Sequence, residues 1–208
     1  VRTVALLITV GGMLVFAMVV GIVSDALGEK VNDLKKGRSR VIESEHTLML
    51  GWTDKSLAIV QEIALANESE GGGTIVVLAE QEKEDMEETL EAAVSTHADP
   101  LRLMGTEVVF RSGNPLMENE LDKVSASTAR SIIALSPDGC DPDEADSRMV
   151  RQVLSLKQFD TLKGHVVVEM QDVDNKDLIN LVASDIAEVI VAHDMIGRLM
   201  IQCAREPG

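Results

Sequence analysis

The sequence predicts an α/β protein in which an N-terminal transmembrane helix is followed by a Rossmann-like, doubly wound parallel sheet. Two observations support this fold class. One is a long apolar stretch near the N-terminus that contains no charged side chain. The other is a series of six short apolar segments, each followed by a segment of helical length. This second pattern is typical of a parallel sheet that helices cover on both faces.

The apolar stretch runs from Val4 to Ser24, and 22 residues separate Arg2 from Asp25. At about 1.5 Å rise per residue, this length suffices to cross a hydrocarbon core of roughly 30 Å. The apolar region of a secretory signal is only about 7–15 residues long. A buried helix of a soluble protein is usually shorter or carries a polar stripe. We therefore expect a transmembrane helix over residues 1–28.

Gly11 and Gly12 lie at the middle of the expected span. Each glycine weakens a helix by roughly 1 kcal/mol relative to alanine, so the pair is a candidate gating hinge or a close contact between helices. Glycine is also more frequent in membrane helices than in soluble ones, without any special role. Both interpretations fit the sequence.

The formal net charge of −16 is distributed unevenly along the chain. Residues 29–40 carry five basic and two acidic side chains, which predicts a basic juxtamembrane linker over residues 29–45 on the cytosol-like side of a membrane. From Val41 onward there are 13 basic and 32 acidic side chains. This acidic body, residues 46–208, disfavours nucleic acid as a partner and favours cations. Cys140 and Cys203 lack the spacing of metal ligands, so we expect reduced thiols.

Six segments of the body have the composition of buried strands, since apolar residues need not alternate with polar ones when both faces of a sheet are covered. They are His46 to Trp52, Thr74 to Ala79, Glu107 to Phe110, Ser131 to Leu135, His165 to Met170, and Glu188 to Ala192. Capping or acidic residues mark most of the expected helix starts between them. The first expected helix is capped by Thr53 or Asp54 and runs to about Ala66. The others are Glu82 to about Thr96, a short helix from near Leu116, Glu144 to about Phe159, Asp174 to Val182, and an apolar last helix, Met195 to Ala204.

In a doubly wound sheet, ligands bind beyond the carboxyl ends of the strands. The loop after the first strand contains the candidate binding residues Gly51, Trp52 and Asp54. It keeps only the first glycine of the G-x-G-x-x-G fingerprint, and Asp54 would place a negative charge against a phosphate. We therefore expect no nucleotide there. Glu80, after the second strand, occupies the position at which an acid binds a ribose, or it is a solvated residue.

Acidic side chains gather where the second, fourth and fifth strands end. The candidate cation ligands are Glu80, Asp141, Glu144, Asp146, Glu169 and Asp172. Ca²⁺ takes about 6–8 oxygen ligands, so neighbouring strand ends could form a site for it. Alternatively, these acids cap helix N-termini. The four histidines are scattered, and no G-x-S-x-G elbow, H-E-x-x-H pair or P-loop lysine occurs, so we expect no enzyme and assign no catalytic residue.

Several stretches resemble the CASTOR/POLLUX family of plant ion channels, and the resemblance covers the whole chain. They are Gly11 to Leu14, Phe16 to Met18, Glu29 to Val31, Leu50 to Lys55, Gly71 to Gly73, Val76 to Glu80, Arg111 to Gly113, Gly164 to Met170, Val191 to Asp194, and Ile196 to Ala204. The resemblance implies a pore-lining inner helix followed by a Rossmann-like RCK domain, assembled as a gating ring in a homotetramer. For the plant members it further implies an integral membrane protein of the nuclear envelope that Ca²⁺ regulates. Ion selectivity does not follow, because the selectivity filter would precede Val1.

These features predict a subunit of a ligand-regulated cation channel, permeable to K⁺ or Ca²⁺. Residues 25–40 would transmit ring movements to the inner helix, which requires that the ligand bind two ring states with different affinity. We expect ring assembly to bury the apolar face formed by Met195, Leu199 and Met200. The alternatives are a membrane-anchored dinucleotide-binding oxidoreductase, which the fold suggests, and a non-channel adaptor that binds a partner through its last helix.

Overall fold

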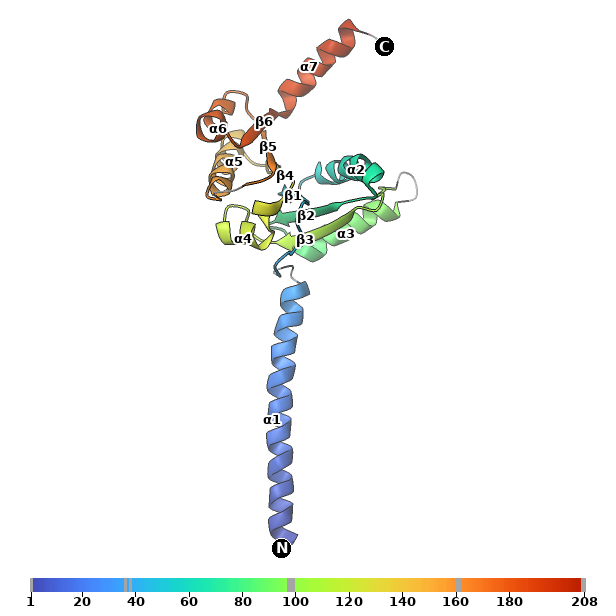
Figure 1. The fold of residues 1–208 in the computed structure, drawn as a ribbon, viewed down its shortest axis with the longest axis vertical. Helices are drawn as coiled ribbons and strands as arrows, with labels where there is room; N and C mark the ends of the chain where they lie inside the picture. Colours follow the sequence, from blue (N-terminus) through green and yellow to red (C-terminus); the bar gives the residue numbers. More distant parts are fainter. Residues whose placement is uncertain (1, 36, 38, 97–99, 160–161, 207–208) are drawn as a thin grey trace.

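The structure is a computed structural model that describes residues 2–35, 37, 39–96, 100–159 and 162–206. One long helix, α1 (Arg2–Lys35), leads into a body built on a parallel sheet, and the last helix, α7 (Ala192–Arg205), leaves the body on the opposite side (Figure 1). The predicted fold class, an apolar N-terminal helix before a Rossmann-like sheet, is confirmed.

Helix α1 is long and apolar enough to cross a membrane. Its window Gly11–Gly28 has a mean hydropathy of 1.8 and is entirely unburied. The helix passes through Gly11 and Gly12 without a break, and a Cβ atom at either position would meet nothing within 4 Å. It also continues beyond residue 28, where we placed the end of the span, to Lys35. The first part of the basic linker is therefore a helical extension of the span.

The sheet has six strands in the order β3-β2-β1-β4-β5-β6, and all neighbours are parallel. The strands are β1 (Thr47–Leu50), β2 (Thr74–Ala79), β3 (Glu107–Ser112), β4 (Ser131–Ala134), β5 (His165–Met170) and β6 (Ala187–Val191). The chain runs outward from β1 to β3, returns to the centre, and then runs outward again from β4 to β6. The order reverses between β1 and β4, which is the topological switch point where such sheets bind ligands.

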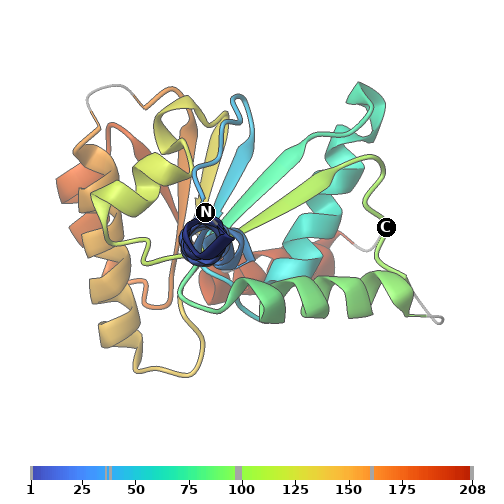
Figure 2. The same ribbon diagram turned by 90° about the horizontal axis from the view of Figure 1, so that it is seen from below.

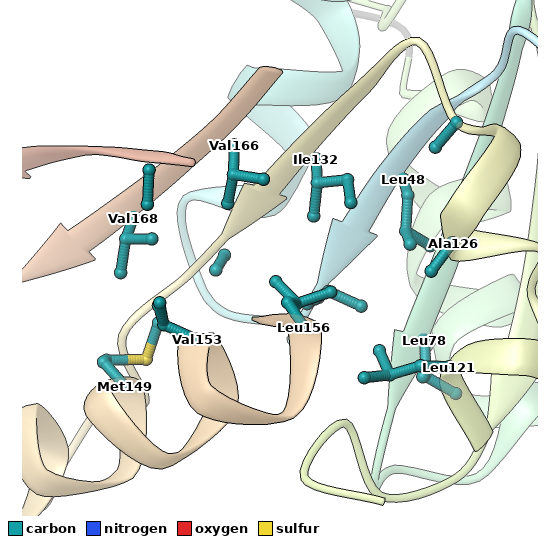
Figure 3. Close-up of a cluster of buried hydrophobic side chains, with 14 of the residues drawn as sticks. Leu48, Leu78, Leu121, Ala126, Ile132, Met149, Val153, Leu156, Val166 and Val168 are labelled. Atoms are coloured by element: carbon teal, nitrogen blue, oxygen red, sulfur yellow. The ribbon is translucent and has the colours of Figure 1, made fainter. Parts of the chain in front are cut away.

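Helices cover both faces of the sheet (Figure 2). On one face lie α2 (Ser56–Asn67) and α3 (Lys83–Ser95), and on the other lie α4 (Glu118–Lys123), α5 (Pro142–Lys157) and α6 (Lys176–Ala183). Each face has its own apolar core. The larger core joins strand residues such as Leu48 and Ile132 to Leu121 of α4 and Leu156 of α5 (Figure 3). The smaller core contains Phe110, Val60 of α2, and Met86 and Leu90 of α3.

Two of the predicted helix starts are wrong for identifiable reasons. Neither Thr53 nor Asp54 caps α2, which begins at Ser56, because the Ser56 N–H donates to the Thr53 carbonyl at 2.9 Å and residues 53–56 form a turn before the helix. Helix α5 begins at Pro142 rather than Glu144, because Asp141 is its cap and accepts from the Asp143 N–H at 3.0 Å. Proline is favoured in this first turn, where its missing N–H costs nothing.

Candidate ligand-binding cleft

A cleft of about 550 Å³ opens at the carboxyl edge of the sheet. The loop after β1, the end of β2 and the loop after β4 form its walls, together with one face of α5. It lies at the switch point between β1 and β4. Both its position and its volume are those expected of a small-molecule site in a doubly wound sheet.

The predicted residues Gly51 and Trp52 line this cleft, but their main contacts are structural. Gly51 has a φ of +104°, and a Cβ atom there would lie 3.3 Å from the Leu135 carbonyl oxygen of the neighbouring chain segment. Trp52 is buried and packs edge-on against Phe110, with 5.1 Å between ring centroids. The retained glycine is therefore explained by the close approach of two strand ends, and no bound phosphate is needed to account for it.

Ion pairs and hydrogen bonds satisfy the charged rim of the cleft. The backbone N–H of Asp54 donates to Oδ2 of Asp138 at 3.1 Å, and Nη2 of Arg148 pairs with Oε2 of Glu80 at 2.6 Å. A carboxylate of the chain thus occupies a backbone donor just before α2, where a phosphate would otherwise bind. An anionic ligand at this end of the cleft has to displace Asp138.

Two residues that line the cleft each have a buried side-chain atom with no partner among the described residues. Gln152 of α5 is 4% exposed, and its Nε2 donates to no acceptor among the residues that the structure describes. The hydroxyl oxygen of Thr53 is likewise buried and unpaired within that part of the chain. An unsatisfied buried polar group costs about 1–3 kcal/mol, so a ligand or water that bonds to Gln152 recovers this free energy. Sequence reasoning missed Gln152, because a glutamine in an amphipathic helix carries no distinguishing pattern.

Asp146, one of the predicted cation ligands, is a structural tie between two loops. It is 1% exposed and accepts three hydrogen bonds, from the Gln171 N–H at 2.8 Å, the Asp172 N–H at 3.0 Å and the Asn175 side chain at 3.0 Å. The acidic segments after β4 and β5 are therefore neighbours in space, as their strand ends suggested. In this arrangement the carboxylate of Asp146 holds the loop after β5 against α5.

The other acidic candidates also have partners or face solvent. Glu169 accepts from Nζ of Lys55 at 2.6 Å and from the Ser136 N–H at 3.2 Å. Asp172 accepts from the Asp174 N–H at 3.0 Å, and Glu144 is exposed. Within the described ranges, no group of three or more histidine, cysteine, aspartate or glutamate side chains is arranged to hold a metal ion.

A second hollow, of about 460 Å³, lies beside the cleft and shares Glu80 with it. Its walls come from the end of β3 and from α4. Nζ of Lys123 pairs with Oε1 of Glu120 at 2.6 Å on this wall. Glu80 therefore stands between the cleft and the edge of the body at which the linker is attached.

The fold and the cleft define a Rossmann-type ligand-binding domain attached to a helix of membrane-spanning length. Among solved structures it is similar to GsuK bound to ADP, with a TM-score of 0.52 and 16% identity over 77% of this chain and 35% of that one. The GsuK channel gives a TM-score of 0.51 at 15% identity, covering 77% of this chain and 24% of that one. The body shares the fold of these two structures, an RCK-like Rossmann fold.

Curated relatives match over the whole chain. The chain is 52% identical to the ion channel CASTOR of Lotus japonicus over 208 residues, which are 100% of this chain and 24% of that protein. It is 51% identical to the ion channel POLLUX of the same plant, again over 100% of this chain and 22% of that one. No family model matches. The chain is a homologue of the CASTOR/POLLUX ion channels, and it spans about a quarter of their length. The predicted resemblance to these channels is confirmed, and these relatives are ion channels and not enzymes.

Proposed function

We propose that the chain is the gate and sensor part of a ligand-regulated cation channel subunit, with α1 as the pore-lining inner helix and the body as one unit of a cytosolic-side gating ring. The observation that carries this proposal is continuity: α1 runs unbroken from the candidate span to Lys35, and the linker that follows is hydrogen-bonded to a domain with a ligand-sized cleft. The similarity to CASTOR and POLLUX supports the channel assignment and counts against the oxidoreductase alternative.

Regulation in this proposal is a shift between two ring geometries. A ligand favours one geometry only to the extent that it binds that geometry more tightly. The body then moves α1, and Gly11 and Gly12 are the hinge at which the inner helix bends. A Cβ atom at either glycine would meet nothing within 4 Å outside the helix's own backbone, so the helix can bend there without displacing another described part of this chain.

Ca²⁺ is the regulator that we propose, with K⁺ or Ca²⁺ as the permeant ion. The charge balance of the body, 13 basic against 32 acidic side chains from Val41 onward, supports a cation. Exposed or half-buried carboxylates remain near the strand ends, among them Asp141, Glu144 and Asp172. Because this chain alone does not gather them into a metal group in its described residues, the proposal places some of the 6–8 oxygen ligands expected for Ca²⁺ on other parts of the ring.

A nucleotide-like ligand in the cleft is the second candidate regulator, contrary to the expectation of no nucleotide. The unpaired Nε2 of Gln152 supports it, since this donor fits an acceptor on a polar organic ligand. GsuK, which shares the fold, is solved bound to ADP. Asp138 opposes phosphate binding, so this candidate requires the loop after β4 to move away from Asp54.

Assembly as a homotetramer is supported by α7, whose apolar side chains have no cover in the part of this chain that the structure describes. Met195, Leu199 and Met200 are all exposed. Apolar surface of this extent is typical of a protein interface, and the ring supplies one. The resemblance to the plant family adds the nuclear envelope as the proposed location, which fluorescence microscopy of the tagged full-length protein tests.

Reconstitution of the full-length protein in planar bilayers tests channel function. The proposal expects cation currents carried by K⁺ or Ca²⁺, and absence of single-channel events with protein shown to be tetrameric would contradict it. Thermal unfolding of the same preparation tests the regulator, because a ligand of the folded state raises Tm by mass action. Ca²⁺ at millimolar concentration should raise Tm more than Mg²⁺ does. If the second candidate, a nucleotide-like ligand, is the regulator, ADP in place of the cation should raise Tm.

A further inference from the structure

The linker between α1 and the sheet is bonded to the body along its whole described length. The Ser112 N–H donates to the Gly37 carbonyl at 3.3 Å, the Val41 N–H donates to the Lys123 carbonyl at 2.7 Å, and the Glu45 N–H donates to the Thr128 carbonyl at 3.0 Å. Three side chains of the body also donate hydrogen bonds to carbonyl oxygens of the linker. Arg111 donates to Ser39 at 2.8 Å, Ser125 to Val41 at 2.8 Å, and Thr128 to Glu43 at 3.4 Å.

These contacts fall on residues 37, 39, 41, 43 and 45, which is every second residue of the segment. Val41 also anchors the segment by its side chain, which is 3% exposed and belongs to the larger core, whereas the side chain of Ile42 is 92% exposed. Gly37 and Glu45 have φ values of +67° and +57°, so the segment turns at both ends. The linker therefore lies on the body as a strap that its backbone hydrogen bonds hold between two turns.

Arg111, at the end of β3, holds the strap near the end that leads to α1. Its Nε donates to the Ser39 carbonyl and its Nη1 to the Phe110 carbonyl at 2.7 Å, so one planar guanidinium joins the strap to the strand. The strap is also tightly confined at Gly37, whose φ is +67°, since a Cβ atom there would lie 3.0 Å from Cδ of Lys83 in α3. Gly37 is two residues beyond the end of α1.

The same strand end connects to the cleft. The Gly113 N–H, next to Ser112, donates to the Ala79 carbonyl at the end of β2 at 2.8 Å. Ala79 precedes Glu80, whose carboxylate pairs with Arg148 on the rim of the cleft. A displacement of Glu80 therefore reaches Gly37 through only the ends of β2 and β3.

We propose that residues 37 and 39–46 form a strap that moves with the end of β3, and that Arg111 is the positioning residue through which the body drives α1. Because every second residue is bonded to the body, the strap has no slack to absorb a movement of that strand end. The coupling part of this inference rests on the proposed channel function. The strap itself does not.

The coupling is tested on the full-length channel with Arg111→Gln, which removes the guanidinium. Ca²⁺ is the probe, and the readout is the ratio of open probabilities with and without it. We expect Arg111→Gln to lower this ratio by at least about fivefold while single-channel conductance and the Ca²⁺-induced rise in Tm stay at wild-type values. Arg111→Lys keeps a cationic donor and should restore part of the ratio. The matched control is Arg102→Gln, an exposed arginine before β3. A wild-type ratio in Arg111→Gln would overturn the coupling role.

Hydrogen exchange on the purified tetramer, without ligand, tests the strap independently of gating. In wild type, the amides of Val41 and Glu45 should be protected, and in Arg111→Gln exchange in the peptide containing residues 37–46 should be about tenfold faster with the sheet unchanged. Exchange in wild type as fast as in an exposed peptide would overturn the proposal. If wild-type open probability does not respond to Ca²⁺, the proposed Ca²⁺ regulation fails and the coupling role fails with it, while this measurement still decides whether the strap exists.

Discussion

The acids near the strand ends and an amide that lines the cleft differ in how their polar atoms are satisfied. Near the ends of β4 and β5, Asp146 accepts three hydrogen bonds and Glu169 accepts two, so these acids hold loops together. In the cleft, Nε2 of Gln152 is buried and has no partner in the described part of the chain. The acids that attract attention in the sequence thus support the architecture. The amide of Gln152, which no sequence pattern singles out, is the group that gains a hydrogen bond when a ligand binds to it.

Asp146→Ala should give the largest effect. It removes a buried acceptor from three donors, so we expect the free energy of unfolding to fall by about 3 kcal/mol. Urea denaturation of the purified chain in detergent measures this, with the fluorescence of Trp52, the single tryptophan, as the probe. Glu144→Ala, two residues away and exposed, is the control and should change stability by less than about 0.5 kcal/mol. A loss below about 1 kcal/mol for Asp146→Ala would remove the distinction between the satisfied acids and the unpaired amide.

Gly51→Ala tests whether the retained glycine of the first loop is architectural. A side chain at φ +104° is strained, and its Cβ would press on the Leu135 carbonyl, so a loss of about 2 kcal/mol is expected in the same assay. In contrast, Gly197→Ala lies in α7 with open space around it and should not lower stability. Equal effects of the two substitutions would contradict the close-approach explanation.

Gln152→Leu sharpens the comparison from the other side. Removing an amide that has no partner in the described residues should leave the free energy of unfolding unchanged or raise it by about 1 kcal/mol, because a buried unsatisfied donor is lost. The substitution keeps the side chain close in size. If the variant is instead destabilised by more than about 1 kcal/mol, Gln152 belongs with the satisfied acids.

His46 lies between the two cases, and its effect depends on pH. Its Nε2 lies 3.1 Å from the Val124 carbonyl, while Nδ1 is buried and unpaired in the described residues. Burial lowers the pKa of His46 below 6.5, whereas in the unfolded chain the ring takes up a proton at about 6.5. As pH falls below about 6.5, the unfolded state therefore binds protons first and the free energy of unfolding decreases. Urea denaturation between about pH 5 and 8 should show a smaller decrease for His46→Gln, and an identical pH dependence would show that His46 does not contribute.

Much of this fold could be predicted because strands β2 and β5 are apolar runs with clear boundaries, and both match the predicted bounds. Helix starts were less predictable, since a local turn can precede a helix, as it does before α2, where the Ser56 N–H donates to the Thr53 carbonyl. The contacts of Gln152 and Arg111 could not be predicted at all. The partner of Arg111 is a backbone carbonyl 72 residues away, and a carbonyl leaves no trace in the sequence.

The open probability of the full-length channel before and after Ca²⁺ is added on the side of the body is the most direct test of the account. The account predicts that Ca²⁺ changes the open probability of wild type by at least about fivefold at constant single-channel conductance. It predicts that Arg111→Gln loses most of this change. An open probability that Ca²⁺ does not alter, in a tetramer whose Tm Ca²⁺ raises, would contradict the claim that the body regulates the pore through the linker.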